Sequence, residues 1–204
     1  MIQFYLLDTT DLPDPKEDKS VLSGIPDWRC EYILKYVRSY DRKLSLGAWR
    51  VLEKTLMRHG FSAENVTIGM TGKPECEGVF FNLSHSGDMV LCAICDMPVG
   101  CDIEKVADAP LEIADRYFSE KERQYIDSSQ SLPEISRRFF RLWTMKESYV
   151  KMTGEGMNLS PERVEIVPDE LTVLRDGVLQ PCTLLNLSHG NYEISICMLW
   201  PDSV

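Results

Sequence analysis

The amino-acid sequence predicts an α+β fold, and three observations support this class. Two long segments have the apolar spacing of helices: residues 41–57, and a segment that runs from Pro133 to Gly154. The other apolar runs are short and bounded by turn residues, which is typical of strands, and the C-terminal half is rich in them. Asn-Leu-Ser-His occurs at 82–85 and again at 186–189, about half of the 204-residue chain apart. Such a repeat predicts two related halves, each with a turn and a strand.

The first half of the chain predicts a strand, two helices and then further strands. Residues 2–7 predict the first strand, and the acidic, proline-containing stretch at 8–20 predicts a loop. A helical spacing of apolar residues predicts a helix over 27–38 and a longer one over 41–57, which Gly60 ends. The elements predicted after these helices are a strand at 65–70, a turn at 71–74, a strand at 80–82, a polar turn at 84–87 and a strand at 89–94.

The second half predicts one long helix among strands. An apolar run at 99–106 predicts a strand. Ser119 and Glu122 have the spacing of a capping box, which predicts the start of a short helix. Ser131 and Glu134 have the same spacing and predict the start of the long helix. The remaining predictions are strands at 163–167, 171–175, 183–187 and 192–199, with a hairpin turn at Asp176-Gly177.

The composition is that of an ordinary globular protein, with 44% hydrophobic and 26% charged residues. The formal net charge is −10 and no basic tract occurs, so we expect neither nucleic-acid binding nor attachment to a membrane surface. No signal peptide or membrane span is expected, and the seven cysteines then predict reduced thiols and a cytoplasmic protein. Cys92 and Cys95 have C-x-x-C spacing, but they lie in an apolar run, so we expect them to fill the core.

Two acids and a helical stripe are the candidate functional residues. Asp102 and Glu104 are two residues apart on the strand at 99–106, so their carboxylates leave one face and repel each other. Such a pair is either solvated or shares a cation, and oxygen ligands without His or Cys suit Mg²⁺. Trp143, Glu147 and Lys151 lie along one face of the long helix. An exposed Glu–Lys pair beside a half-buried Trp would give the same stripe, but Glu147 as a third carboxylate favours a metal site.

Several motifs follow one another along residues 40–157. They are Gly72-Lys73-Pro74, Phe81-Asn82-Leu83-Ser84-His85-Ser86, Gly100-x-Asp102-Ile103-Glu104, Arg116-Tyr117-Phe118-Ser119-Glu120-Lys121-Glu122, Trp143-Thr144-x-Lys146-Glu147-Ser148-x-x-Lys151 and Gly154-x-Gly156. Together these motifs resemble the 4′-phosphopantetheinyl transferase superfamily, in its surfactin-synthetase-activating type. One residue departs from the family pattern: Glu155 lies inside a Gly-x-Gly turn where basic or neutral residues are more usual. This departure concerns how the turn meets phosphate or the carrier partner.

The resemblance implies a fold of two similar half-domains related by a pseudo-two-fold axis. Each half would be a small antiparallel sheet packed on a long helix, with the active site between the halves. We place the halves at 1–96 and 97–204, packed as one globular unit, with the metal site in the second. Because both halves lie in one chain, we expect the protein to act as a monomer.

The resemblance also implies the activity. The 4′-phosphopantetheine group of coenzyme A would pass to a serine of an apo acyl or peptidyl carrier protein, releasing 3′,5′-ADP. Asp102, Glu104 and Glu147 would hold Mg²⁺ on the pyrophosphate, and Lys151 would stabilise or protonate the leaving oxygen. Either Glu147 or a metal-held water would accept the serine proton. Lys146 is either a further phosphate contact or a solvated lysine.

The family further implies contacts to coenzyme A from Arg42, Lys73, Ser84, His85 and Lys151. Arg42 matches the family arginine at the 3′-phosphate or adenine, Lys73 would contact phosphate, and Ser84-His85 belongs to the motif at the 3′-phosphate. We expect Arg42, Lys73 and His85 to converge on the non-reacting end of coenzyme A. Without the resemblance, each of these three would be a solvated surface residue.

Two other classes of function are compatible with the acids alone. A divalent-metal phosphohydrolase would also use three carboxylates, and a non-catalytic carrier-binding module would need only the surface. Under either alternative the ordered motifs would be a coincidence.

Overall fold

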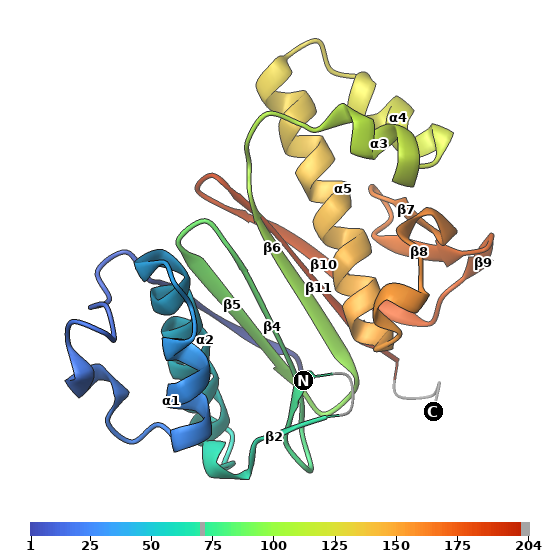
Figure 1. Ribbon diagram of the computed structural model, residues 1–204. Helices are drawn as coiled ribbons and strands as arrows, with labels where there is room; N and C mark the ends of the chain where they lie inside the picture. Colours follow the sequence, from blue (N-terminus) through green and yellow to red (C-terminus); the bar gives the residue numbers. More distant parts are fainter. Residues whose placement is uncertain (70–71, 201–204) are drawn as a thin grey trace.

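The computed structural model describes residues 1–69 and 72–200 (Figure 1). Helix α2, two three-stranded antiparallel sheets and helix α5 follow one another as four packed layers across the molecule. The predicted combination of helices with small antiparallel sheets is therefore confirmed. Within the described part of the chain, no helix combines the length and the apolar character that a membrane span requires.

The first half of the chain builds the sheet β1-β5-β4 and the helices that cover it. Its central strand, β5, pairs antiparallel with both neighbours, so that Leu91 lies opposite Leu6 of β1 and Ser84 of β4. The elements are β1 (Gln3–Asp8), η1 (Lys19–Leu22), α1 (Asp27–Leu34), α2 (Ser39–Arg58), η2 (Ala63–Asn65), β2 (Thr67–Ile68), β3 (Pro74–Glu75), β4 (Phe80–Ser86) and β5 (Met89–Cys95).

The second half builds the sheet β6-β11-β10 on helix α5. Its central strand, β11, again pairs antiparallel with the first strand of its half and with the strand just before it in the chain. The elements are β6 (Val99–Lys105), α3 (Leu111–Tyr117), α4 (Glu120–Asp127), α5 (Leu132–Thr153), η3 (Gly156–Asn158), η4 (Pro161–Arg163), β7 (Val164–Val167), β8 (Thr172–Arg175), β9 (Val178–Leu179), β10 (Cys182–His189) and β11 (Tyr192–Leu199).

The two sheets share one connectivity. Each half begins with an edge strand, continues through helices and a small separate sheet, and ends with a hairpin whose second strand takes the centre of the main sheet. The separate sheets are β2-β3 in the first half and β7-β8-β9 in the second. The repeated Asn-Leu-Ser-His lies at matching places, on β4 and on β10. The pseudo-two-fold axis and the division at residue 96 remain predictions.

Strand β5 is buried on both faces and connects the layers. Val90 and Cys92 belong to the core shared with α2, whereas Leu91, Ala93 and Cys95 belong to the core between the two sheets. A strand covered on both sides is expected to have a continuous apolar sequence, as this one has. The prediction that Cys92 and Cys95 fill the core is confirmed, since both thiols are free and buried.

Gly100 allows α5 to approach β6. A Cβ at this position would overlap the carbonyl oxygen of Ser148 and the amide nitrogen of Met152, both in the α5 backbone. Only a residue without a side chain permits such a contact. The approach brings the part of α5 that carries Glu147 and Lys151 against β6.

Both expectations for Lys146 are wrong, because this lysine is fully buried. Its ammonium lies 2.9 Å from Glu122 of α4 and donates to the carbonyl oxygens of Pro161, at 3.2 Å, and Val164. Glu122 also forms the predicted capping box with Ser119. The Lys146–Glu122 pair therefore ties α4 and the segment before β7 to α5.

Arg42 is also buried, which contradicts its expected contact with coenzyme A. Its guanidinium makes two hydrogen bonds to Asp14, one of them 2.7 Å long, and holds the pKa of that carboxyl well below its usual range. It also donates to the carbonyl oxygens of Tyr36, at 3.0 Å, and Val37, at 2.6 Å. These contacts fix the loop after β1 and the connection between α1 and α2, so the guanidinium is committed to the fold.

Several local predictions differ from the structure. The helix predicted over 27–38 ends at Leu34. The polar turn predicted at 84–87 is largely the end of β4, so His85 lies on a strand. Ser131 precedes α5 but makes no side-chain capping hydrogen bond. The strand predicted at 65–70 is reduced to the two residues of β2; its last position and the first of the following turn lie outside the described residues. Gly154 ends α5 as predicted, with φ of 72°.

Substitution of Gly100 by Ala should destabilise the fold. The added methyl must displace helix backbone rather than a flexible side chain, so we expect a loss of about 3 kcal/mol in the free energy of unfolding. Urea unfolding followed by far-UV circular dichroism measures this loss. Gly60→Ala is the control: its φ is 82° with open space around it, so only the left-handed conformation is penalised, by about 1 kcal/mol. Equal losses for the two variants would contradict the close approach.

Substitution of Arg42 by Ala should destabilise the protein by about 3–5 kcal/mol, because it leaves the buried Asp14 carboxylate without its counterion. Lys43→Ala, the next residue of α2, removes an exposed contact to the carbonyl oxygen of Thr10 and should lose less than about 1 kcal/mol. The same urea titration measures both. A stable Arg42→Ala variant would show that the guanidinium is not a structural anchor.

Candidate active site

The candidate site lies where edge strands of the two sheets meet. Strand β4 ends the first sheet, β6 ends the second, and the two pack side by side (Figure 1). Asp102 of β6 is buried, and its Oδ1 accepts a hydrogen bond of 2.8 Å from Ser84 of β4. Two residues further along each strand, Ser86 donates a hydrogen bond of 2.7 Å to Oε2 of Glu104. Hydroxyls of the first half therefore hold carboxylates of the second.

Lys151 of α5 completes a three-way contact with Asp102 and Ser84. Its Nζ lies 2.6 Å from Asp102 Oδ1 and 3.1 Å from Ser84 Oγ. Burial by itself lowers the pKa of an ammonium, but the Asp102 carboxylate outweighs that effect and the pKa of Lys151 is raised. Lys151 is therefore a cation at neutral pH.

Glu147 lies one helical turn before Lys151. Burial, and then the negative charge of Asp102, raise the pKa of the Glu147 carboxyl. Burial likewise raises the pKa of Asp102, and the pKa of Glu104 rises through burial and through its neighbours Asp102 and Glu147. The negative charges of these acids repel one another in a poorly solvated region. A cation bound among them would offset that repulsion.

The chemistry of these residues fits a hard divalent cation. Oδ2 of Asp102 is buried, and no donor in the described part of the chain reaches it. A buried carboxylate oxygen without a donor is costly, and oxygen is the ligand that Mg²⁺ prefers. Within residues 1–69 and 72–200, however, no three His, Cys, Asp or Glu side chains are already arranged as a metal site. The site formed by Asp102, Glu104 and Glu147 thus remains a prediction.

A cavity of about 810 Å³ opens beside these groups, and we call it the central cavity. Lys73, Glu147 and Lys151 are among the residues that line it. Burial, with a contribution from the charge of Lys151, lowers the pKa of Lys73. An anion in this cavity would meet two ammonium groups from separate elements, which favours phosphate groups as ligands.

The departure at Glu155 is compensated within the fold. Glu155 lies at the rim of the central cavity, and Arg175 of β8 donates two hydrogen bonds to its carboxylate, at 2.5 and 2.9 Å. The bidentate pair holds the pKa of Glu155 below its usual range. Arg175 therefore neutralises the negative charge that Glu155 would otherwise bring to the cavity.

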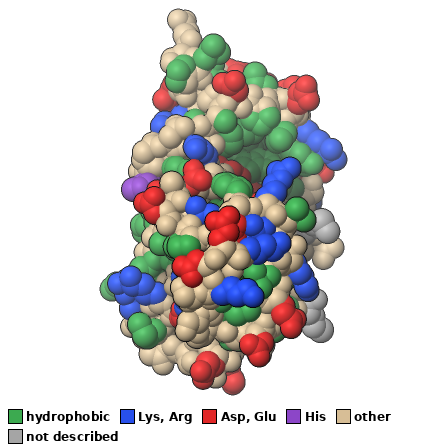
Figure 2. Space-filling model, turned by 60° about the vertical axis from the view of Figure 1, so that its left-hand side comes forward, with side chains coloured by type: hydrophobic (Ala, Val, Ile, Leu, Met, Phe, Trp, Pro, Cys, Tyr) green, Lys and Arg blue, Asp and Glu red, His purple; other side chains and the backbone are tan. Residues whose placement is uncertain are grey.

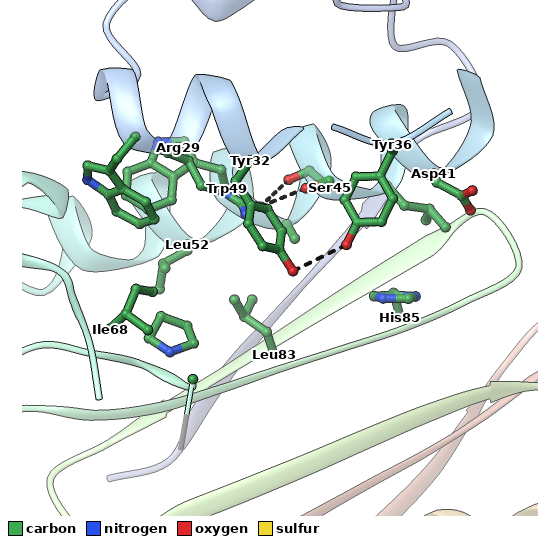
Figure 3. A pocket seen from close by; sticks show the side chains of 15 residues that line it. Arg29, Tyr32, Tyr36, Asp41, Ser45, Trp49, Leu52, Ile68, Leu83 and His85 are labelled. Atoms are coloured by element: carbon green, nitrogen blue, oxygen red, sulfur yellow. Dashed lines mark hydrogen bonds between the residues drawn. The ribbon is translucent and has the colours of Figure 1, made fainter. Parts of the chain in front are cut away.

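A second cavity, of about 660 Å³, lies between helices α1 and α2 and strand β4 (Figure 3). Tyr32 and Tyr36 present their rings from one side, and Leu83 and His85 come from β4 on the other. Burial and the charge of Lys151 lower the pKa of His85, so its ring is neutral at pH 7. We call this the aromatic cavity; its lining comprises Trp28, Arg29, Tyr32, Tyr36, Asp41, Leu44, Ser45, Ala48, Trp49, Leu52, Ile68, Gly72, Pro74, Leu83 and His85.

Arg29 is a candidate binding residue that the sequence reasoning missed. Its guanidinium lies 4.9 Å from the centre of the Tyr32 ring and donates to the backbone oxygen of Ser45 at 2.6 Å and to its hydroxyl at 3.0 Å. Its Nε is buried without an acceptor among the described residues. The spacing of Arg29, Tyr32 and Tyr36 on one helical face was an available signal. The expected convergence of Arg42, Lys73 and His85 is not seen: Lys73 lines the central cavity, His85 lines the aromatic cavity, and Arg42 lines neither.

The face of the molecule shown in Figure 2 does not carry its negative charge as one patch. On the face shown in Figure 2, acidic and basic side chains are interspersed. At physiological salt, fields between exposed charges fade over about 8 Å, so nearby groups decide whether a polyanion binds. Arg29, Lys73 and Lys151, which line the two cavities, supply such local cations in a chain with net charge −10.

Comparison with known proteins identifies the family. The model of the 4′-phosphopantetheinyl transferase superfamily matches residues 98–197. The chain is 34% identical over 186 residues to the 4′-phosphopantetheinyl transferase gsp of Aneurinibacillus migulanus, an alignment that covers 87% of this chain and 78% of that protein. It is 32% identical over 198 residues to a 4′-phosphopantetheinyl transferase of Bacillus subtilis, covering 91% and 87%. With psf-1 of Bacillus pumilus it shares 38% identity over 137 residues, covering 64% and 58%. The chain therefore belongs to the 4′-phosphopantetheinyl transferase superfamily, in its surfactin-synthetase-activating type.

Proposed function

We propose that this chain transfers the 4′-phosphopantetheine group of coenzyme A to a serine of an apo acyl or peptidyl carrier protein. The observation that carries the proposal is the contact among Lys151, Asp102 and Ser84, with Glu147 beside it, at the central cavity. The serine oxygen bonds to the β-phosphorus of coenzyme A, and the bond from that phosphorus to the bridging oxygen breaks. The bridging oxygen leaves on 3′,5′-ADP and becomes anionic, so the site needs cations in position.

Lys151 acts on the leaving oxygen, and Glu147 acts on the attacking serine. The Lys151 ammonium, held by Asp102 and Ser84, faces the cavity with 30% of its side chain exposed and stabilises or protonates the leaving oxygen. Glu147, which lines the central cavity, accepts the proton of the carrier serine.

Asp102, Glu104 and Glu147 would hold Mg²⁺. When bound, the ion supplies positive charge to the pyrophosphate of coenzyme A. The buried Oδ2 of Asp102 and the raised pKa values of the three acids support this assignment.

Coenzyme A would span the two cavities. Its pyrophosphate would lie at Lys73, Ser84 and Lys151, and its nucleotide end would lie in the aromatic cavity. Planar rings such as adenine stack well on aromatic faces, and Arg29 and His85 offer donors to the 3′-phosphate there.

The two halves, 1–96 and 97–204, would be related by a pseudo-two-fold axis and would act as a monomer in the cytoplasm. Their shared strand order and connectivity support the axis. The partners would be coenzyme A and apo carrier proteins, without nucleic acid or membrane.

Incubation of the protein with coenzyme A, Mg²⁺ and an apo carrier should add one phosphopantetheine group to the carrier, which intact-protein mass spectrometry detects. EDTA and Asp102→Ala should each lower the rate by at least about 100-fold, since loss of one transition-state contact typically costs that much. Asp96→Ala, an acid with 74% of its side chain exposed, is the control and should keep the wild-type rate. No mass shift with carriers of either class would contradict the proposed function, and full activity of Asp102→Ala would contradict the metal site.

Arg29→Ala should raise the KM for coenzyme A by about 10-fold and leave kcat within about 2-fold. The lost charged hydrogen bond acts on the non-reacting end of the substrate and is equal in ground and transition states. Steady-state kinetics of carrier modification measures both constants, and Lys43→Ala, a nearby cation outside the cavity lining, is the control. An unchanged KM in a folded Arg29→Ala variant would place the nucleotide end elsewhere.

A further inference from the structure

The junction between β4 and β6 is made by side chains. The two strands belong to different sheets, and their contacts advance together, from Asn82 with Cys101 to Ser84 with Asp102 and Ser86 with Glu104. They therefore run in the same direction. Asn82, Ser84 and Ser86 lie at alternate positions, so their side chains share the face of β4 that is turned to β6.

Two hydrogen bonds fix the hydroxyl of Ser86. Its Oγ accepts a hydrogen bond of 3.0 Å from the backbone N–H of Lys105, and it donates its proton to Oε2 of Glu104 at 2.7 Å. A serine hydroxyl has one proton to donate. Because the Ser86 oxygen already accepts a hydrogen bond from the backbone, its single proton points to the Glu104 carboxylate. This contact uses Oε2 and leaves Oε1 of Glu104 for a ligand.

The turn after Ser86 is held from both halves of the chain. Tyr40 of α2 donates a hydrogen bond of 2.5 Å to the carbonyl oxygen of Gly87, and the backbone N–H of Asp88 donates to the hydroxyl of Tyr192 at 3.3 Å. A side chain at Gly87, whose φ is 51°, would meet Tyr192 and Lys105. The hydroxyl of Ser86 is therefore presented from backbone that has little freedom to move.

Only one copy of the internal repeat has this hydroxyl. Asn-Leu-Ser-His at 82–85 is followed by Ser86, whereas the second copy at 186–189 is followed by Gly190. Ser188, the counterpart of Ser84, also holds a carboxylate, with a hydrogen bond of 2.6 Å to Glu193. The additional serine–carboxylate bond thus occurs in the copy that borders the candidate site.

We propose that Ser86 is a positioning residue, which holds the Glu104 carboxylate toward Asp102 and Glu147 from the other half of the chain. This proposal rests on the proposed function. Glu104 is the more exposed of the two acids on β6. Its flexible side chain needs a hydrogen-bond partner such as Ser86 to keep one rotamer. Partners of this kind typically change metal affinity by 10–100-fold when they are removed. The site is then complete only when β4 of the first half is aligned with β6 of the second, so that Ser86 meets Glu104.

The test measures metal binding apart from turnover. Mn²⁺ replaces Mg²⁺, and its binding to the wild-type chain with coenzyme A but without carrier is followed by electron paramagnetic resonance, corrected for Mn²⁺ bound by free coenzyme A. Ser86→Ala should raise the Kd for Mn²⁺ by about 10-fold or more. Ser86→Thr, which keeps the hydroxyl, should stay within about 3-fold of wild type. In the transfer assay, Ser86→Ala should raise the KM for Mn²⁺ and leave the KM for the carrier unchanged.

Ser188→Ala is the matched control, because it removes an equally short serine–glutamate hydrogen bond from Glu193, the β11 residue opposite Glu104, which Arg137 already pairs with. Its Kd for Mn²⁺ should stay within about 2-fold of wild type. Thermal unfolding checks each variant, and Ser86→Cys, which keeps the shape but weakens the donor, serves if Ser86→Ala does not fold. An unchanged Kd for Ser86→Ala, an equal effect of Ser188→Ala, or no Mn²⁺ binding by wild type would overturn the proposal. If wild type modifies no carrier protein, the proposed function fails instead.

Discussion

The contact of Lys151 with Asp102 and Ser84 is the interaction on which the rest of this structure depends. It joins helix α5, strand β6 and strand β4, which lie far apart in the sequence, at one buried point. A buried carboxylate is strongly unfavourable unless a counterion and hydrogen-bond donors accompany it. Asp102 receives both, yet one of its oxygens stays without a donor among the described residues, so the site is compensated only in part. That oxygen is the observation that supports the proposed Mg²⁺ site.

The backbone geometry explains why these groups can meet. Gly100, Asp102 and Glu104 lie at alternate positions of β6 and face α5 together. The residue without a side chain lies where α5 comes closest, and the two acids follow along the same face. On α5, Glu147 and Lys151 are one turn apart and reach the same region. A strand and a helix of ordinary geometry thus place charges of both signs beside one cavity.

Two other buried ion pairs support the halves and show how cations are divided between fold and function. Arg42 is bound to Asp14 in the first half and Lys146 to Glu122 in the second, and the donors of both also serve backbone carbonyls. A cation whose hydrogen bonds are satisfied internally stabilises the fold and has nothing left for a substrate. Lys151 and Arg29 differ, because each lines a cavity while its partners hold it in place. In a chain of net charge −10, this division decides where a polyanionic substrate can bind.

The sequence alone predicted the class of fold and most of the strands and helices, and its motifs singled out Asp102, Glu147 and Lys151 as candidate site residues. These features depend on local periodicity, on caps such as Ser119 with Glu122 and Gly154, and on motifs whose order is itself specific. Only the tertiary structure decided which cations are available. Arg42 and Lys146 have side chains suited to phosphate, and nothing in their local sequence shows that carboxylates from distant segments already occupy them. Likewise, His85 lies on a strand rather than in a turn because β5 and β6 hold β4 extended. Arg29 is a candidate binding residue because α1 and β4 line the same cavity. The physical reason is the same in each case: burial and ion pairing depend on long-range contacts, which a local pattern of residues does not encode.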